Sequence, residues 1–182
     1  MPHGKGILSM NIKKVDSKVR ERCWFQSPIG WLTLEATAKG VAAIHFGRQG
    51  SKPESKVVSA HLRSLMDQLG TYFQGNLRHF KVKLDREGTD FQEQVWAALR
   101  SIPYGETRSY KDIAVEVGRD KAVRAVGSAN NRNPLPIVVP CHRVVGSSGD
   151  LVGYAAGLKI KRFLLDLENS ASKRKKTAAR TS

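Results

Sequence analysis

The stretch from Ile137 to Val145 reads Ile-Val-Val-Pro-Cys-His-Arg-Val-Val. Its leading β-branched residues predict a short buried strand, which the proline ends. Directly after this strand, Cys141 stands beside His142 at a point where the backbone must turn. Such an arrangement can hold a thiol in a lined pocket, so we take Cys141 as the candidate centre of a site.

A cysteine needs a neighbour to act as a nucleophile at neutral pH. Its thiol titrates near pH ~8.5 and only the thiolate attacks well, so a base or a cation is required. His142 and Arg143 are adjacent, and Glu168 near the end of the following helix is available to orient a base. Cys141, His142 and Glu168 therefore form a working constellation. A cysteine behind an apolar strand is also commonly a small core residue, and adjacency alone leaves both interpretations open.

The composition predicts a protein with its own hydrophobic core. The chain has 182 residues, 40% of them hydrophobic, which suffices for one domain or two small ones. No apolar stretch approaches the ~18 residues of a membrane span, and the first residues lack the apolar core of a signal peptide. We therefore expect an intracellular protein, cytoplasmic in a prokaryote or nuclear in a eukaryote, with Cys23 and Cys141 as free thiols.

The charge predicts a polyanionic partner. The 31 basic residues outnumber the 16 acidic ones, which gives a net charge of +15 and a pI of about 10.2. This excess does not by itself distinguish DNA from RNA or from an anionic membrane. Part of it lies in residues 1–22, interpreted as a flexible basic lead-in, and in residues 169–182, interpreted as a disordered tail. A localisation signal, a phosphate contact and simple solvation all remain open for that tail.

Residues 23–86 have the pattern of a small α/β domain. Short apolar runs separated by turn residues predict an antiparallel meander up to Phe46. A helical pattern follows and ends at Gly75, the expected left-handed cap, and residues 80–84 alternate like a further strand. No catalytic signature appears in this half. Three histidines are assigned to the surface or the core rather than to a ligand set: His45, His61 and His79.

Residues 87–168 predict a mostly helical domain. Thr89 with Gln92 forms a capping-box pattern that opens one helix, and Ser109 with Asp112 repeats the pattern at the next. The expected fold class is therefore α+β.

Two short helices around Gly118 indicate a helix-turn-helix. Asp120 is placed to cap the second helix, which is expected to turn Val123 and Val126 inward. This helix is rich in small residues and carries the long cation Arg124 in its middle, which suits close approach to a groove or, alternatively, tight helix packing. Because many helical hairpins share the pattern, DNA binding and plain packing both remain open.

Several motifs together resemble the O6-alkylguanine-DNA alkyltransferase family. They are Arg-Ala-Val-Gly at 124–127, Asn-Pro-Leu-Pro-Ile at 133–137, Pro-Cys-His-Arg-Val at 140–144, Gly-Tyr-Ala-Ala-Gly-Leu at 153–158 and Leu-Leu-Asp-Leu-Glu at 164–168. The resemblance is strong over residues 88–168 and weaker over residues 23–84. It implies a small α/β domain like the RNase H core, followed by a helix-turn-helix domain of winged-helix type.

The resemblance implies direct-reversal DNA repair. A protein of this family transfers an alkyl group from O6 of guanine, and less readily from O4 of thymine, onto its own cysteine after base flipping. The thioether is not regenerated, so each molecule acts once, irreversibly and without a cofactor. The implied partner is double-stranded DNA with an alkylated guanine, bound through the minor groove by a monomer that acts alone or cooperatively.

The family's roles can be carried over position by position. Cys141 is the acceptor, His142 activates it through a water, and Glu168 orients His142. Asn133 braces the turn between the recognition helix and the site, while Tyr110 presses on the phosphate and meets the extruded base.

The remaining roles concern the flipped base and the DNA. Arg124 fills the vacancy in the base stack. Backbone groups of Cys141, Val144 and Ala155 bind the guanine edge, and Tyr154 lines the pocket. Three more residues of the recognition helix are expected DNA contacts: Ser128, Ala129 and Asn130.

Two features depart from the family pattern or from some of its members. The family commonly has two glycines after Tyr154 and the next small residue, whereas this chain has Ala156 before Gly157. The extra methyl is expected to narrow the pocket against bulky alkyl groups. Some relatives hold zinc in the N-terminal domain, but only Cys23 is available there among scattered histidines, so no metal is expected.

Three other classes of protein remain as alternatives. A non-enzymatic lesion sensor resembles the same family but lacks the cysteine, so Cys141 argues against it. A Cys-His hydrolase or redox protein would turn over repeatedly, and nothing else in the chain supplies a convincing oxyanion hole. In a plain DNA-binding regulator, Cys141 would be a core residue.

Overall fold

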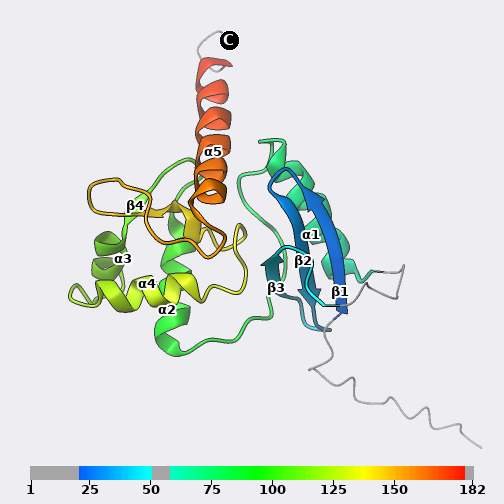
Figure 1. Ribbon diagram of the computed structural model, residues 1–182, viewed down its shortest axis with the longest axis horizontal. Coiled ribbons are helices and arrows are strands. Elements are labelled where there is room, and N and C mark those ends of the chain that lie inside the picture. Colours follow the sequence, from blue (N-terminus) through cyan, green and yellow to red (C-terminus); the bar gives the residue numbers. More distant parts are fainter. Residues whose placement is uncertain (1–20, 51–57, 179–182) are drawn as a thin grey trace, which may run out of the picture.

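The computed structural model describes residues 21–50 and 58–178, with side chains up to Lys173. A small sheet and one helix form one part of the molecule, and a group of helices forms the other (Figure 1). This is the α+β architecture that the sequence predicted. Most of the expected basic lead-in, residues 1–20, lies outside the described residues, whereas Glu21 and Arg22 already belong to the first strand.

The sheet consists of three antiparallel strands in the order β1–β2–β3: β1 (Glu21–Ser27), β2 (Gly30–Ala36) and β3 (Val41–Phe46). Cys23 stands opposite Leu34, which stands opposite Ile44. Because side chains alternate between the faces of a sheet, these three lie on one face, and all three are buried. The predicted meander is confirmed.

Helix α1 (Ala60–Phe73) packs against this sheet. Ser59 caps its start by accepting a hydrogen bond from the Leu62 N–H at 3.3 Å. Gly75 follows its end with φ +77°, so the predicted left-handed glycine is confirmed.

The further strand expected at residues 80–84 is wrong. Only Leu84 forms an isolated bridge, parallel to Val41, and two backbone hydrogen bonds of 2.8 Å attach the segment there. Gly40 permits this close approach, since a Cβ at that position would lie 2.6 Å from the Lys83 carbonyl oxygen. Alternation was present in the sequence, but the segment pairs at a single point.

The second part contains α2 (Asp90–Ser101), α3 (Tyr110–Glu116), α4 (Val123–Asn131) and α5 (Leu158–Ala178). Both predicted capping boxes are present, at Thr89 and at Ser109. A short parallel pair joins β4 (Arg108–Ser109) to β5 (Val144–Val145). Helices α3 and α4 form the expected helix-turn-helix and pack on α2.

The start of α4 differs from the prediction. Its cap is Ala122, which makes no side-chain hydrogen bond, so Asp120 does not cap the helix. Gly118 adopts φ +69° and ends α3 as expected. Val126 is fully buried, but Val123, in the first turn of α4, is 36% exposed, so the expectation that it turns inward is wrong.

The stretch before Cys141 is a buried turn rather than the predicted strand. It closes with an isolated bridge between Pro136 and Val139. Ile137 between them has φ +76° and is the only non-glycine residue with positive φ in the described part of the chain. This conformation is costly for a β-branched residue, so its surroundings must hold it. The β-branched run therefore predicted the burial of this stretch correctly, but its prediction of an extended backbone is wrong.

The end of the chain also differs. Helix α5 continues past Glu168 to Ala178 and projects from the helical part, where a disordered tail was expected from Asn169 (Figure 1). Ala171 explains part of this difference, because it is 7% exposed and belongs to the hydrophobic core. Residues 179–182 lie outside the described part.

One hydrophobic core runs through both parts. It includes Leu34 of the sheet, Tyr72 of α1, Trp96 of α2 and Cys141 itself. Trp96 is 1% exposed and its indole N–H donates to the Ala129 carbonyl at 2.9 Å. The sheet and the helix-turn-helix are therefore fixed relative to the turn that carries the cysteine.

The capping box of α2 gives a stability prediction. Thr89→Ala removes the hydroxyl that accepts from the Gln92 N–H, so we expect the free energy of unfolding to fall by about 1 kcal/mol. Thr89→Ser keeps the acceptor and serves as the control. Urea denaturation measures both, and an alanine variant with the wild-type midpoint would contradict the role of the cap.

Candidate active site

The turn before Cys141 is braced by Asn133. Its side-chain amide donates to the Val139 carbonyl at 2.8 Å, and its side-chain oxygen accepts from the Leu135 N–H at 3.0 Å. Cys141 then opens the short 3-10 helix η1 (Cys141–Arg143). One asparagine thus links the segment after α4 to the backbone just before the thiol.

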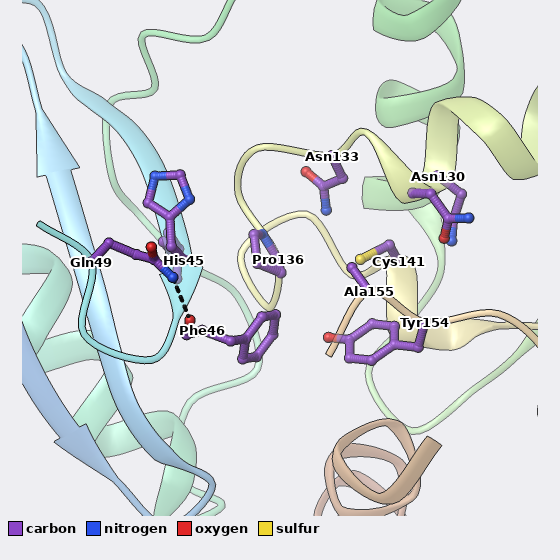
Figure 2. Close-up of a pocket in the computed structure, with 11 residues that line it drawn as sticks. His45, Phe46, Gln49, Asn130, Asn133, Pro136, Cys141, Tyr154 and Ala155 are labelled. Atoms are coloured by element: carbon purple, nitrogen blue, oxygen red, sulfur yellow. Dashed lines mark hydrogen bonds between the residues drawn. The ribbon is translucent and has the colours of Figure 1, made fainter. Parts of the chain in front are cut away.

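Cys141 lies on the wall of a cavity of about 280 Å³. Figure 2 shows its side chain between Asn133 and Tyr154, with the Phe46 ring facing Tyr154 from the sheet. The two rings meet edge to face with centroids 5.9 Å apart. Residues from both parts of the molecule line the cavity: Ile44, His45, Phe46 and Gln49 from the sheet side, and Asn130, Asn131, Asn133, Pro136, Cys141, Tyr154 and Ala155 from the helical side.

Behind the cysteine, His142 and Glu168 form a buried pair. Both are 0% exposed, and His142 Nε2 lies 2.9 Å from Glu168 Oε1. Arg143 donates to both carboxylate oxygens at 2.9 Å. With Nε2 donating to Glu168, the other imidazole nitrogen, Nδ1, carries the lone pair, and it has no hydrogen-bond partner in the structure.

The protonation states of this pair follow from its surroundings. Burial alone would raise the pKa of Glu168, but the hydrogen bonds from His142 and Arg143 outweigh it and hold that pKa well below its ordinary value. Burial lowers the pKa of His142, which the neighbouring carboxylate only partly offsets. At neutral pH the site therefore contains an ionised glutamate and a neutral histidine, which can accept a proton at Nδ1.

The Cys141 thiol is itself buried. Burial raises its pKa, while the Asn133 amide and the positive charge of Lys161 act in the opposite direction. Lys161 is 0% exposed, and its ammonium donates to the Val152 carbonyl at 2.7 Å. Burial lowers the pKa of Lys161 to about 8. The resting cysteine is thus a thiol that needs a base before it can attack.

Two tyrosines of the helical part, Tyr110 and Tyr154, interact electrostatically with Cys141. Burial raises the pKa of Tyr110 and, more strongly, of Tyr154, and a Cys141 thiolate would raise both further. The Tyr110 hydroxyl lies 3.4 Å from the carbonyls of Val152 and Gly153. Tyr154 lines the cavity, whereas Tyr110 lies at the start of α3 and is not among its lining residues.

The expected DNA contacts on α4 differ in accessibility. Arg124 and Ser128 are exposed. Ala129 is 3% exposed and its carbonyl already accepts from Trp96, so its side chain does not face solvent. Asn130 is 2% exposed, but it lines the cavity and its side-chain oxygen has no hydrogen-bond partner among the described residues.

The remaining predicted residues flank the cysteine. Val144 is fully buried, and its N–H donates to the Cys141 carbonyl. Ala155 lines the cavity, but Ala156 does not. The expectation that the Ala156 methyl narrows the pocket is therefore not supported, because Ala156 does not line the cavity.

Sequence reasoning missed several residues at or near the site. Tyr72 from α1 donates its hydroxyl hydrogen to Glu168 Oε1 at 2.8 Å, and Lys161 faces the cysteine from α5. Three more come from the sheet side and line the cavity: His45, Phe46 and Gln49. The burial of Lys161 could not be predicted from the sequence, because the residues around it have the ordinary pattern of an amphipathic helix. His45 was assigned to the surface or the core, because nothing local indicated which wall β3 would form.

Cys23 contrasts with Cys141. Both are free and buried, but the Cys23 sulfur lies 3.7 Å from the Met66 sulfur inside the core, away from the cavity. Burial raises its pKa to about 11. Among the described residues, no cluster of three or more His, Cys, Asp or Glu side chains could hold a metal ion, and no helix there is long and apolar enough to cross a bilayer.

A braced cysteine backed by a His-Glu pair, next to a helix-turn-helix, is typical of a DNA-binding protein with a candidate nucleophilic cysteine. Comparison with known proteins narrows this class. Residues 90–170 match the family model described as 6-O-methylguanine DNA methyltransferase, DNA binding domain. A methylated-DNA–protein-cysteine methyltransferase of Methanosarcina acetivorans is 52% identical over 150 residues, covering 80% of this chain and 96% of the relative. One from Mycobacterium tuberculosis is 48% identical over 147 residues, covering 79% and 89%.

Solved structures agree. The crystal structure of Mycobacterium tuberculosis O6-methylguanine methyltransferase matches with a TM-score of 0.75 at 44% identity, covering 84% of this chain and 94% of that one. The Mycobacterium tuberculosis OGT structure in complex with DNA matches with a TM-score of 0.74 at 47% identity, covering 81% and 92%. The chain therefore belongs to the methylated-DNA–protein-cysteine methyltransferase family, and the resemblance seen in its sequence is confirmed.

The buried histidine predicts how stability depends on pH. Below about pH 6.5 a histidine in the unfolded chain binds a proton, whereas buried His142, with its lowered pKa, resists protonation. The unfolded state then binds more protons, so the free energy of unfolding falls as the pH drops below that value. Glu168, whose pKa is depressed, adds a further loss below about pH 4.3.

Denaturant titrations at about pH 7.5 and about pH 5.5 measure this difference. We expect His142→Asn to lose less stability between the two pH values than wild type. His79→Asn, at an exposed position, is the control and keeps the wild-type difference. Equal pH dependence in wild type and His142→Asn would contradict a neutral buried histidine.

Proposed function

We propose that this protein, a DNA-repair methyltransferase by family, removes alkyl groups from O6 of guanine in duplex DNA and, more slowly, from O4 of thymine. The acceptor is Cys141, and each molecule reacts once, because the thioether is not cleaved again. The observation that carries the proposal is the position of the thiol: it lies on a cavity wall, and the next residue, His142, is hydrogen-bonded to buried Glu168 at 2.9 Å. No cofactor takes part.

The chemistry starts with proton removal from the thiol. In the proposed mechanism a water carries the proton from Cys141 Sγ to His142 Nδ1, which has no hydrogen-bond partner in the described part of the chain. Glu168 holds the imidazole by Nε2 and stabilises the imidazolium that forms. Asn133 and Lys161 stabilise the thiolate, because both act to lower the pKa of Cys141.

Transfer is a direct displacement at the alkyl carbon. The thiolate electron pair forms the new S–C bond while the C–O6 bond breaks and its electron pair stays on guanine. The guanine anion then takes up a proton, for which Tyr110 is the proposed donor. Backbone groups of Cys141, Val144 and Ala155 are the proposed partners of the guanine edge, and Tyr154 stacks against the base. The His142 imidazolium then releases the cysteine proton to solvent and Tyr110 takes up a proton from solvent, so the net products are a thioether and normal guanine.

The damaged base must leave the helix to reach the thiol. Extruding a nucleotide costs a few kcal/mol, and least for a poorly paired lesion. Exposed Arg124 on α4 is the proposed residue that enters the stack in place of the base. Ser128 and the backbone around Ala129 and Asn130 would then approach the DNA closely. Because α4 offers few long side chains for reading bases, we propose minor-groove binding by a monomer with weak sequence preference.

A mass measurement tests the acceptor. Intact protein incubated with duplex DNA that carries O6-methylguanine should gain one methyl group, mapped to Cys141, with no turnover beyond one methyl per molecule. Cys141→Ala should gain none, and Cys23→Ala should react like wild type. Tight binding to the lesion without added mass would instead favour a sensor, and repeated turnover would favour a hydrolase.

The role of Arg124 is tested by comparing two substrates. Arg124→Ala should slow transfer from methylated duplex by roughly tenfold or more, because the extruded state loses the group that replaces the base. Transfer from free O6-benzylguanine needs no extrusion and should keep its wild-type rate. Single-turnover kinetics measure both reactions, and equal slowing on the two substrates would show that Arg124 acts on the pocket instead.

A further inference from the structure

One hydroxyl of the sheet-and-helix part reaches the catalytic pair. Tyr72 on α1 is 1% exposed, and its hydroxyl donates to Glu168 Oε1 at 2.8 Å. The same oxygen lies 2.9 Å from His142 Nε2. We propose that Tyr72 is a positioning residue for alkyl transfer, through which the N-terminal part of the chain holds Glu168 and sets how strongly it retains the proton on His142. This inference rests on the proposed transfer to Cys141.

The hydrogen bonds of Glu168 leave little freedom to its carboxylate. Oε1 accepts from Tyr72, from His142 and from Arg143. Oε2 accepts from Arg143 and from the Gly105 N–H at 3.0 Å. Gly105 has φ +79°, and a Cβ there would lie 2.5 Å from the Ser172 hydroxyl oxygen, so this backbone donor depends on glycine. Of these groups, only Tyr72 comes from the N-terminal part.

The hydroxyl has a specific electrostatic effect. A donor to Oε1 draws negative charge away from the oxygen that His142 contacts. It therefore weakens the electrostatic attraction between the Glu168 carboxylate and a protonated His142. Removing it should make His142 more basic. The other charged or titratable groups that interact with this pair or with Tyr72 would all remain: Arg143 on η1, Tyr104 beside Gly105, Tyr154, and Lys161 on α5.

The ring of Tyr72 has a separate, structural role. It packs against Phe73, Phe80 and Tyr104, with centroid distances of 5.4, 5.5 and 6.1 Å. A phenylalanine would fill the same space, so Tyr72→Phe removes the hydroxyl and keeps the packing. Phe80→Leu does the reverse, because it removes a ring contact and leaves the hydroxyl on Glu168. These two variants separate positioning from packing.

The experiment measures the single-turnover rate of methyl transfer to Cys141 as a function of pH, with methylated duplex DNA and the full-length protein. Tyr72→Phe should react roughly tenfold more slowly at neutral pH, because Glu168 loses a hydrogen bond that holds it against His142 and this loss of positioning outweighs the gain in basicity. Its rate should also begin to fall at a higher pH on the acid side than that of wild type, because His142 takes up its proton earlier. Phe80→Leu should show no such displacement along the pH axis.

A measurement without DNA gives a second test. NMR titration of His142 in the folded protein should show a higher pKa in Tyr72→Phe than in wild type. If wild type methylates Cys141 but Tyr72→Phe retains its rate, pH profile and His142 titration, the inference is overturned while the proposed function stands. A rate that decreases without moving along the pH axis would also overturn it. If wild type gains no methyl group, the proposed function itself fails.

Discussion

The structure depends on one buried carboxylate. Glu168 on α5 is fully enclosed and accepts hydrogen bonds from α1, from the loop after α2 and from η1. Arg143, also buried, supplies the balancing charge and donates besides to the Ile102 carbonyl at 2.7 Å. Removal of one partner from such a group leaves an uncompensated charge in the interior, which costs several kcal/mol. The network therefore fixes how α1, α5 and the cysteine turn sit together.

This constraint explains why the Cys141 thiol lies where both parts of the molecule meet. The Ile44 N–H of β3 donates to the Pro134 carbonyl at 2.9 Å, so the sheet touches the turn that Asn133 braces. The cavity then receives one wall from the end of β3 and the other from the helical part, as Figure 2 shows. A substrate that enters from the helix-turn-helix side would meet both. The N-terminal part is thus a component of the site as well as a support for it.

Burial has opposite effects on the pKa values of the two groups that exchange a proton in the proposed mechanism. It raises the pKa of the Cys141 thiol and lowers that of His142, so each is neutral at rest. A neutral pair is compatible with an apolar interior, whereas a permanent thiolate-imidazolium pair would need more polar support. In the proposed mechanism, the ionised Glu168 and the buried Lys161 supply part of that support when the charges separate. The same burial that stabilises the core therefore also keeps the thiol unreactive until a base removes its proton.

The sequence by itself determined what is local or compositional. Capping boxes at Thr89 and Ser109, the meander and the family motifs around Cys141 all follow from short spacings, because caps, turns and periodicity involve neighbouring residues. Tertiary structure alone decided the rest. The β-branched run before Cys141 became a turn because long-range contacts outweigh strand propensity, and Tyr72 reached Glu168 across 96 residues of chain. Neither the β-branched run nor the helical spacing around Tyr72 contains that information, since a buried hydrogen bond depends on which surfaces pack together.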